Sequence, residues 1–235
     1  MGRTLFLSIV TLVVGFCLGL VVNFGLLGPG GGPDHPASSL LPAMKIPAES
    51  AYATTAPTST AAPELDAEDN QQLLAAANQA VAALRDQDYR ALAALVHPVE
   101  GVLFTPYSTV DPEANLRFTA DQIAGLRQDS TKYVWGIQDG KGDRLELTMK
   151  DYFARYVYNA DFAKAPVIGI DYVIGTGNAL ENVSEVFPDA RFVEYYFPGI
   201  KPENEGFDWC GLKLVFSVYQ GKFKLISVIH SQWTV

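Results

Sequence analysis

The sequence is poor in the side chains that build disulfide frameworks, metal centres and standard active sites. It has two cysteines, Cys17 and Cys210, and three histidines among 235 residues. Two cysteines do not make a disulfide framework, and three histidines are too few for a typical histidine-rich zinc site. The chain also lacks a G-x-S-x-G elbow, a P-loop, an H-E-x-x-H helix and a G-x-G-x-x-G turn after a strand. These absences exclude the enzyme classes that the signatures identify, and we expect no metal and no cofactor.

Basic side chains are scarce as well. The 26 Asp and Glu residues outnumber the 17 Lys and Arg residues, which form no stripe along the chain. Because binding to nucleic acid needs clustered Lys and Arg to neutralise phosphates, nucleic acid is not an expected partner. Charged residues make up only 18% of the chain and hydrophobic residues 49%, which excludes a fully disordered protein.

The first long feature of the chain is an uncharged apolar run from Thr4 to Leu27. At about 1.5 Å per residue, a helix of this length spans the roughly 30 Å hydrocarbon core of a bilayer. A cleaved signal peptide is the alternative, but its apolar stretch is typically only about 7–15 residues long. A lipoprotein signal would place a small residue before its cysteine, whereas Phe16 precedes Cys17. We predict that residues 1–27 hold a short N-terminus and an uncleaved signal anchor, which contacts the lipid bilayer through residues 4–27.

The remaining chain divides into a linker and a domain. Arg3 is the only charged side chain before the span, so the positive-inside rule places the N-terminus in the cytoplasm. Residues 28–66 are rich in Gly, Pro, Ala and Thr and have no regular period, which predicts a disordered linker. Residues 67–235 are long enough to bury a hydrophobic core. The predicted organisation is a single-pass protein of the cell membrane with a tethered extracytoplasmic domain.

Periodicity predicts helices early in this domain and strands late. An apolar set that includes Leu73, Ala77 and Leu84 recurs at three- and four-residue spacing, which indicates a helix capped by Asp66 or Asp69. Runs rich in Val, Ile, Phe and Tyr predict strands over residues 180–187, 191–197, 210–219 and 222–233, after a loop over residues 159–177. We expect an α+β fold in which a curved antiparallel sheet packs on helices. This order of elements resembles the NTF2-like or cystatin-like cone, in which a bent sheet wraps an N-terminal helix.

The last two predicted strands read as a hairpin with a two-residue turn at residues 220–221. Continued along both strands, this register places His230 opposite Gly211, on the face away from Leu214 and Phe216. A residue without a side chain leaves room for an imidazole ring, so a packing role for His230 is expected. Cys210 falls on the apolar face, where a buried structural thiol is expected.

Six polar side chains are candidates for a ligand-binding site: His97, Tyr107, Glu194, Tyr196, Asp208 and His230. Glu194 and Tyr196 alternate onto one face of their strand together with Phe192. A carboxylate, an imidazole and phenols that converge on a sheet could perform general acid–base catalysis, because burial can raise a Glu pKa toward neutrality. The competing interpretation is structural, in which the two histidines bind nearby backbone or carboxylate groups. No residue is assigned as catalytic.

Several fragments resemble an uncharacterised group of bacterial cell-envelope proteins, many of them lipoproteins. The similarity covers about residues 84–235, and its fragments are residues 96–98 (VHP), 101–102 (GV), 104–107 (FTPY), 192–199 (FVEYYFPG), 208–209 (DW) and 229–234 (IHSQWT). The closing His-x-Gln-Trp-Thr motif and the Glu-Tyr-Tyr-Phe-Pro-Gly strand are the most specific parts. The resemblance implies a bacterial extracytoplasmic module and implies no reaction. The chain departs from the lipoprotein members because Cys17 lacks the context of a lipid acceptor.

Three functions remain compatible with these observations. The first is a membrane-tethered binding or interaction module of the bacterial cell envelope, with an envelope protein or a small molecule as its partner. The second is a small hydrolase or isomerase, which requires His230 and Glu194 to line a pocket. The third is a self-associating structural domain, which requires an exposed apolar sheet face as its homodimer surface. Whether the space between sheet and helices is filled or hollow discriminates among them.

Overall fold

A computed structural model of the protein describes residues 63–233. The predicted membrane span at residues 4–27 and nearly all of the predicted linker lie outside the described residues. From Pro63 to Trp233, no helix is both long enough and apolar enough to cross a bilayer. The positions of all elements below refer to this part of the chain.

A long first helix and a long last hairpin enclose a series of shorter elements. The helices are α1 (Pro63–Arg85), α2 (Tyr89–Leu95), α3 (Ala120–Gly125), α4 (Met149–Tyr152) and α5 (Val183–Val186), and α4 continues as a π-helical turn over Phe153–Val157. The strands are β1 (Val102–Thr105), β2 (Leu116–Phe118), β3 (Lys132–Ile137), β4 (Arg144–Thr148), β5 (Val167–Ile170), β6 (Arg191–Phe197), β7 (Cys210–Tyr219) and β8 (Lys222–Gln232). The expected α+β class is confirmed.

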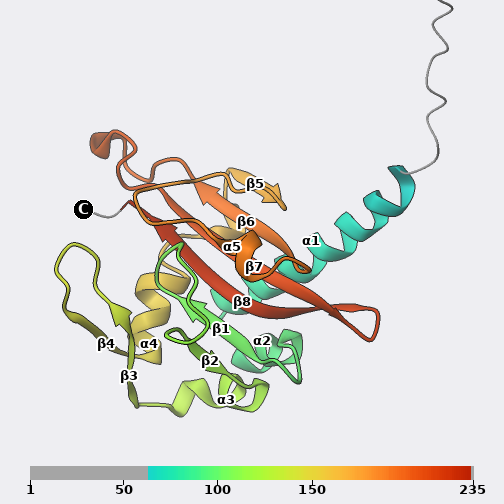
Figure 1. Ribbon diagram of the computed structural model, residues 1–235, viewed down its shortest axis with the longest axis horizontal. Helices are drawn as coiled ribbons and strands as arrows, with labels where there is room; N and C mark the ends of the chain where they lie inside the picture. The colour runs from blue at the N-terminus through green and yellow to red at the C-terminus, as the bar shows by residue number, and fades with distance from the viewer. Residues whose placement is uncertain (1–62, 234–235) are drawn as a thin grey trace, which may run out of the picture. The chain divides into compact units, whose positions relative to one another are not determined.

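Six of the strands form one sheet in the order β2-β1-β8-β7-β6-β5. All neighbours in this sheet are antiparallel except β1 and β8, which run parallel. Strands β3 and β4 form a separate hairpin. Figure 1 shows α1 crossing behind the sheet, while α4 and the β3–β4 hairpin lie beside the end of β8. The sheet therefore packs its inner face on helices, as expected.

The inner face of the sheet carries the main hydrophobic core. Strand β7 contributes Leu212, Leu214 and Phe216, which pack with Leu73 and Ala77 of α1. These apolar side chains recur every second residue in the strand and every three or four residues in the helix, the spacing that places them on one face of each element. The amphipathic pattern predicted from the sequence is confirmed here.

Aromatic rings fill the space between the sheet and α4. Trp135 of β3 stacks on Tyr152 of α4, with ring centroids 3.6 Å apart and planes 6° apart. Phe104, Phe118 and Tyr156 surround this pair at centroid distances of 5.4–6.3 Å. Trp135 and Tyr152 are fully buried. The space between the sheet and α4 is therefore filled by side chains rather than hollow.

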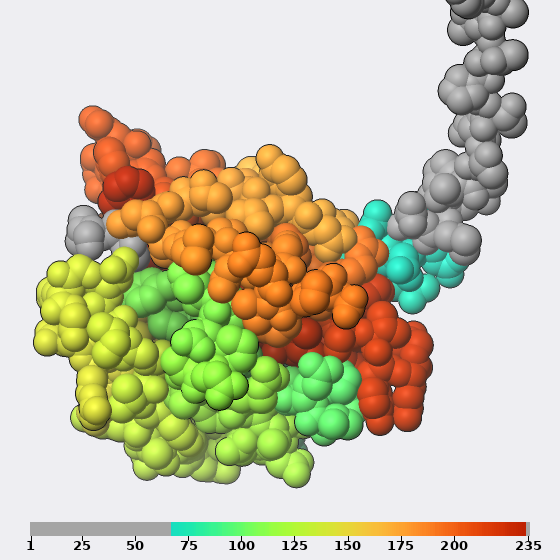
Figure 2. Space-filling model, viewed as in Figure 1, coloured from blue at the N-terminus to red at the C-terminus, as the bar shows by residue number. Residues whose placement is uncertain are grey.

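The outer face of the sheet is also covered. Residues 171–190, here called the cover segment, cross this face and bring Val183 and Phe187 onto Phe192, Val215 and Ile229. Val110, from the loop between β1 and β2, belongs to the same buried cluster. Figure 2 shows the cover segment in orange next to this loop in green. The exposed apolar sheet face required for the predicted homodimer surface is not present in residues 63–233, because these two segments occupy it.

The register predicted for the last hairpin is correct near its turn and wrong beyond a β-bulge. Tyr219 pairs with Lys222 as expected, but the register shifts between Val215 and Phe216, and Ile226 has no partner residue. One extra residue in a strand moves every later side chain to the other face. His230 therefore pairs with Leu212 and lies on the inner face, not opposite Gly211 on the outer one.

Three other local predictions are wrong. Residues 180–187 are not a strand, because Val183, Val186 and Phe187 use helical spacing to pack one short helix, α5, on the outer face. Strand β5 lies inside the predicted loop 159–177 and forms the edge of the sheet. Helix α1 begins at Pro63, ahead of both predicted caps, because proline suits the first position of a helix.

Candidate functional site

The outer face of the sheet holds a buried charged cluster. Lys213 of β7 places its Nζ 2.6 Å from Glu181 Oε2 and 3.7 Å from Glu194 Oε1. The same Nζ donates a hydrogen bond of 3.0 Å to Ser231 Oγ, which also accepts one from Ser108. Lys213 and Glu194 are both fully buried. We call Lys213, Glu181, Glu194, Ser231 and Ser108 the lysine cluster.

Strand register explains how these residues meet. Glu194 of β6 lies directly opposite Lys213 of β7, and Gly211 lies opposite Ser231 of β8. A Cβ atom at Gly211 would lie 2.6 Å from Glu194 Oε1, so glycine is needed at this position to admit the carboxylate. The sheet therefore brings one ammonium group and one carboxylate together, and the cover segment supplies Glu181.

The lysine cluster fastens the cover segment to the sheet. Glu194 Oε2 accepts a 2.7 Å hydrogen bond from the backbone amide of Ile174, and Glu181 Oε1 accepts one from the amide of Val183. Burial raises the pKa of Glu194, while Lys213 and the Ile174 amide act in the opposite direction. A buried carboxylate in this setting depends on its partners to remain ionised.

Glu194 and Tyr196 share the outer face with Phe192, as predicted, but no histidine joins them. Tyr196 packs on Trp209, with ring centroids 5.8 Å apart. His230 lies on the opposite face of the sheet, where its ring contacts Tyr156 at 5.8 Å and its Nε2 lies 3.1 Å from Gln232 Oε1. The acid–base pair required for the predicted enzyme, His230 with Glu194, is therefore separated by the sheet.

His230 is fully buried, and burial lowers its pKa from 6.5 to about 4. The imidazole is therefore neutral at pH 7, and its Nδ1 has no hydrogen-bond partner within the described residues. On the same inner face, burial raises the pKa of Cys210 to about 12. A thiol in this state is not a nucleophile, as expected for a structural cysteine.

Two other predicted candidates, His97 and Asp208, form hydrogen bonds within their own loops. His97 Nδ1 accepts hydrogen bonds from the amides of Val99 and Glu100, and the His97 ring packs edge-on against Tyr219. Asp208 accepts hydrogen bonds from two backbone amides, of Ile200 and Lys201, and from the side chain of Asn204. These hydrogen bonds lower the pKa of Asp208. Both residues hold their own loops in shape.

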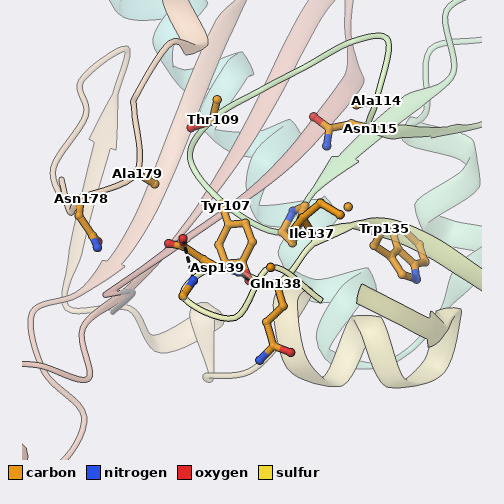
Figure 3. Close-up of a pocket in the computed structure, with 14 residues that line it drawn as sticks. Tyr107, Thr109, Ala114, Asn115, Trp135, Ile137, Gln138, Asp139, Asn178 and Ala179 are labelled. Atoms are coloured by element: carbon orange, nitrogen blue, oxygen red, sulfur yellow. Dashed lines mark hydrogen bonds between the residues drawn. The ribbon is translucent and has the colours of Figure 1, made fainter. Parts of the chain in front are cut away.

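Of the six candidates, Tyr107 lines a sizeable pocket among the described residues. The pocket has a volume of about 720 Å³ and is bounded by the loop after β1, the β3–β4 hairpin and the cover segment (Figure 3). Its lining residues are Pro106, Tyr107, Thr109, Ala114, Asn115, Trp135, Gly136, Ile137, Gln138, Asp139, Gly140, Gly142, Asn178 and Ala179. This volume falls within the range typical of small-molecule sites.

Hydrogen bonds between the three segments fix the walls of the pocket. The backbone amide of Asp139 donates to the Tyr107 hydroxyl at 3.1 Å, which joins the hairpin to the loop. Thr109 Oγ1 donates to the carbonyl of Leu180 at 2.8 Å. Asn182 accepts from the amide of Val110 and donates to its carbonyl. The loop and the cover segment therefore support each other beside the pocket.

Most of the side chains that line the pocket are uncharged. The lining has hydroxyl, amide and aromatic groups with one carboxylate, Asp139, and includes no Lys, Arg, His, Cys or Glu. Within residues 63–233, no three His, Cys, Asp or Glu residues lie close enough together to hold a metal ion.

Comparisons with known proteins find similar solved structures and no similar sequences. No protein-family model matches the chain, and no curated protein resembles it in sequence. A domain from Xanthomonas campestris, provisionally named as a calcium/calmodulin dependent protein kinase II association domain, is similar with a TM-score of 0.27 and 12% identity. The similarity covers 72% of this chain and 85% of that one.

Two further solved structures are similar at the same level. The protein Aln2 from a Streptomyces species has a TM-score of 0.30 and 11% identity, covering 73% of this chain and 92% of its own. A Streptomyces avermitilis protein, provisionally named as a dehydratase of the NTF2-like family, has a TM-score of 0.27 and 16% identity, covering 72% and 98%. At these TM-scores the likenesses assign neither an activity nor a ligand. The resemblance to the cell-envelope group stays a prediction.

Replacing Lys213 with Met in the full chain is expected to lower the free energy of unfolding by about 3–5 kcal/mol, because the buried Glu194 and the partly buried Glu181 lose their counter-charge. Urea unfolding of the detergent-solubilised protein, followed by tryptophan fluorescence, measures this change. The control Lys222→Met, at an exposed position of β8, should stay within about 0.5 kcal/mol of wild type. The triple variant Lys213→Met/Glu181→Gln/Glu194→Gln should recover much of the loss. Equal costs for Lys213→Met and Lys222→Met would contradict the role of the lysine cluster.

The pH dependence of stability provides a second test. The unfolded chain binds a proton at His230 below pH 6.5 and the folded chain only below about pH 4, so falling pH destabilises the fold across this window. The full effect is roughly 3 kcal/mol by linkage. His230→Gln should cost about 1 kcal/mol at pH 7. The unfolding free energy of His230→Gln should then approach and exceed that of wild type as the pH falls toward 4. If the unfolding free energies of the two proteins instead change in parallel with pH, His230 is not buried in its neutral form.

Proposed function

We propose that the chain is a membrane-tethered extracytoplasmic module of the bacterial cell envelope that binds a small molecule. The anchor is the predicted span at residues 4–27, and the predicted linker, which ends where α1 begins at Pro63, tethers the domain to it. The binding site is the pocket between the loop after β1, the β3–β4 hairpin and residues 178–179. NTF2-like geometry, in which a curved sheet encloses an N-terminal helix, is the architecture that we propose for the module.

The observation that carries this proposal is the pocket itself. It has the volume of a ligand site, its walls are tied together by hydrogen bonds, and its lining combines an aromatic ring with hydroxyl and amide groups. Such a combination of apolar surface and a few placed polar groups is typical of binding sites. Its lining includes no Lys, Arg, His, Cys or Glu, which favours binding over turnover.

The two alternatives receive less support from the same residues. A hydrolase or isomerase would need His230 and Glu194 to share a cavity, whereas both are fully buried on opposite faces of the sheet. Self-association through the outer sheet face would need that face to be open, whereas the cover segment packs on it. The pocket, in contrast, is accessible in the structure as it stands.

A pocket-filling substitution tests the proposed site. The detergent-solubilised full chain is heated with each of five probes of different chemistry: N-acetylglucosamine, lysine, citrate, octanoate and glycylglycine. We expect at least one probe to raise the Tm in a concentration-dependent way, because a ligand that binds only the folded state stabilises it. Ala179→Trp, which fills the pocket, should abolish that rise. Ala75→Trp, the same change at an exposed position of α1, should preserve it.

Two results would contradict the proposal. One is that none of the five probes raises the Tm. The other is a rise that Ala179→Trp retains in full, which would place the binding elsewhere on the protein.

A further inference from the structure

The charge of the pocket lining indicates a ligand class, provided that the proposed function holds. Among the described residues that line the pocket, Asp139 is the one charged side chain. Asp139 is exposed, and no Lys, Arg or His within residues 63–233 forms an ion pair with it. Its Oδ1 accepts a 3.0 Å hydrogen bond from the amide of Gly140. A carboxylate that has no counter-charge of its own can accept charge-assisted hydrogen bonds from a cationic ligand.

The segments that bound the pocket add further negative charge. The loop over residues 106–115 contains Asp111 and Glu113 and no basic residue. The turn of the β3–β4 hairpin adds Asp143 and one basic residue, Lys141, which is exposed and does not line the pocket. Charges of one sign around a concave site attract ligands of the opposite sign. An anionic ligand would be repelled, and it would also lose hydration without gaining a counter-charge.

Tyr107 gives the pocket an aromatic ring next to this carboxylate. The amide of Asp139 donates to the Tyr107 hydroxyl at 3.1 Å, which holds the ring beside the Asp139 side chain (Figure 3). Tyr107 is only partly buried, whereas Trp135, the other aromatic residue of the lining, is fully buried against Tyr152. The π electrons of an accessible ring attract an ammonium group. The ring and the carboxylate therefore favour the same charge on a ligand.

An apolar side chain completes the site. Ile137 ends β3, lines the pocket and is 56% exposed. It precedes Asp139 by two residues, so the hairpin brings an apolar contact and a carboxylate to the same wall. Covering Ile137 with hydrocarbon is favourable because apolar surface leaves water. The lining therefore matches a ligand that joins an ammonium group to a compact hydrocarbon skeleton.

We infer that the pocket binds a small organic cation, whose ammonium group contacts Asp139 and whose hydrocarbon skeleton packs on Tyr107 and Ile137. The ammonium group donates hydrogen bonds to the Asp139 carboxylate, which determines the preference for a cation. This inference names the ligand class for the proposed site and assigns Asp139 as the residue that determines specificity.

Three cyclohexyl compounds that share a ring and differ in charge test the ligand class. At pH 7 cyclohexylamine is a cation, cyclohexanol is neutral and cyclohexanecarboxylate is an anion. Isothermal titration calorimetry with the full chain in a non-ionic detergent should show cyclohexylamine binding at least about fivefold more tightly than cyclohexanol. Cyclohexanecarboxylate should bind most weakly. Equal or tighter binding of the alcohol or the carboxylate would overturn the inference.

Asp139→Asn tests the assigned residue. The affinity for cyclohexylamine should fall about fivefold, to that for cyclohexanol, while the affinity for cyclohexanol stays unchanged, because the substitution removes a charge and little volume. The matched control Asp143→Asn removes the same charge from the same turn, at an exposed position outside the lining, and should preserve the preference for the amine. A preference retained in Asp139→Asn, or an equal loss in Asp143→Asn, would overturn the role of Asp139.

The proposed function and this inference fail in different ways. If one of the five probes of the thermal test binds in a manner that Ala179→Trp abolishes while cyclohexylamine does not bind, the pocket is a ligand site and the ligand class is wrong. If neither those five probes nor the cyclohexyl compounds bind, the proposed function itself fails.

Discussion

The ammonium group of Lys213 is the feature on which the outer half of the structure depends. It lies between two carboxylates in a fully buried position, 2.6 Å from Glu181 and 3.7 Å from Glu194. Charges at such depth are tolerated only when paired, so the fully buried Lys213 and Glu194 depend on this cluster, and the partly buried Glu181 completes it. Glu194 comes from the sheet and Glu181 from the cover segment. Glu181 belongs to no strand, so this pairing, and not the backbone hydrogen bonds of the sheet, joins it to β7.

This pairing also lies next to one wall of the pocket. Asn178 and Ala179 line the pocket and immediately precede Leu180, whose carbonyl accepts from Thr109, and Glu181, which binds Lys213. The segment that forms one wall of the proposed ligand site is therefore fastened to the sheet by the ion pair between Glu181 and Lys213. The opposite wall is held by the Tyr107 hydroxyl, which accepts from the amide of Asp139. A rigid site of this kind loses little conformational entropy when a ligand binds.

Sequence reasoning predicts the fold class and the long elements because those depend on periodicity. The spacing of Leu73 and Ala77 predicts α1, and the turn at residues 220–221 predicts the start of the last hairpin. The bulge at Ile226 is not predictable, because nothing in the sequence marks an extra residue in a strand rich in Val and Ile. That single residue moves His230 from the outer face to the inner one. The lysine cluster is equally hidden, because its charged members are 13 and 19 residues apart along the chain and only the fold brings them together.

Hydrogen exchange measured residue by residue tests the central claim that Lys213 holds the cover segment on the sheet. In Lys213→Met, the account predicts faster exchange at Ile174, whose amide binds Glu194, and at Glu185 and Phe187 within and just after α5. Amides of the β7–β8 ladder should exchange at nearly their wild-type rates, because local opening leaves the rest of the sheet intact. Unchanged protection of the cover segment in Lys213→Met, under conditions in which the sheet stays folded, would contradict the account.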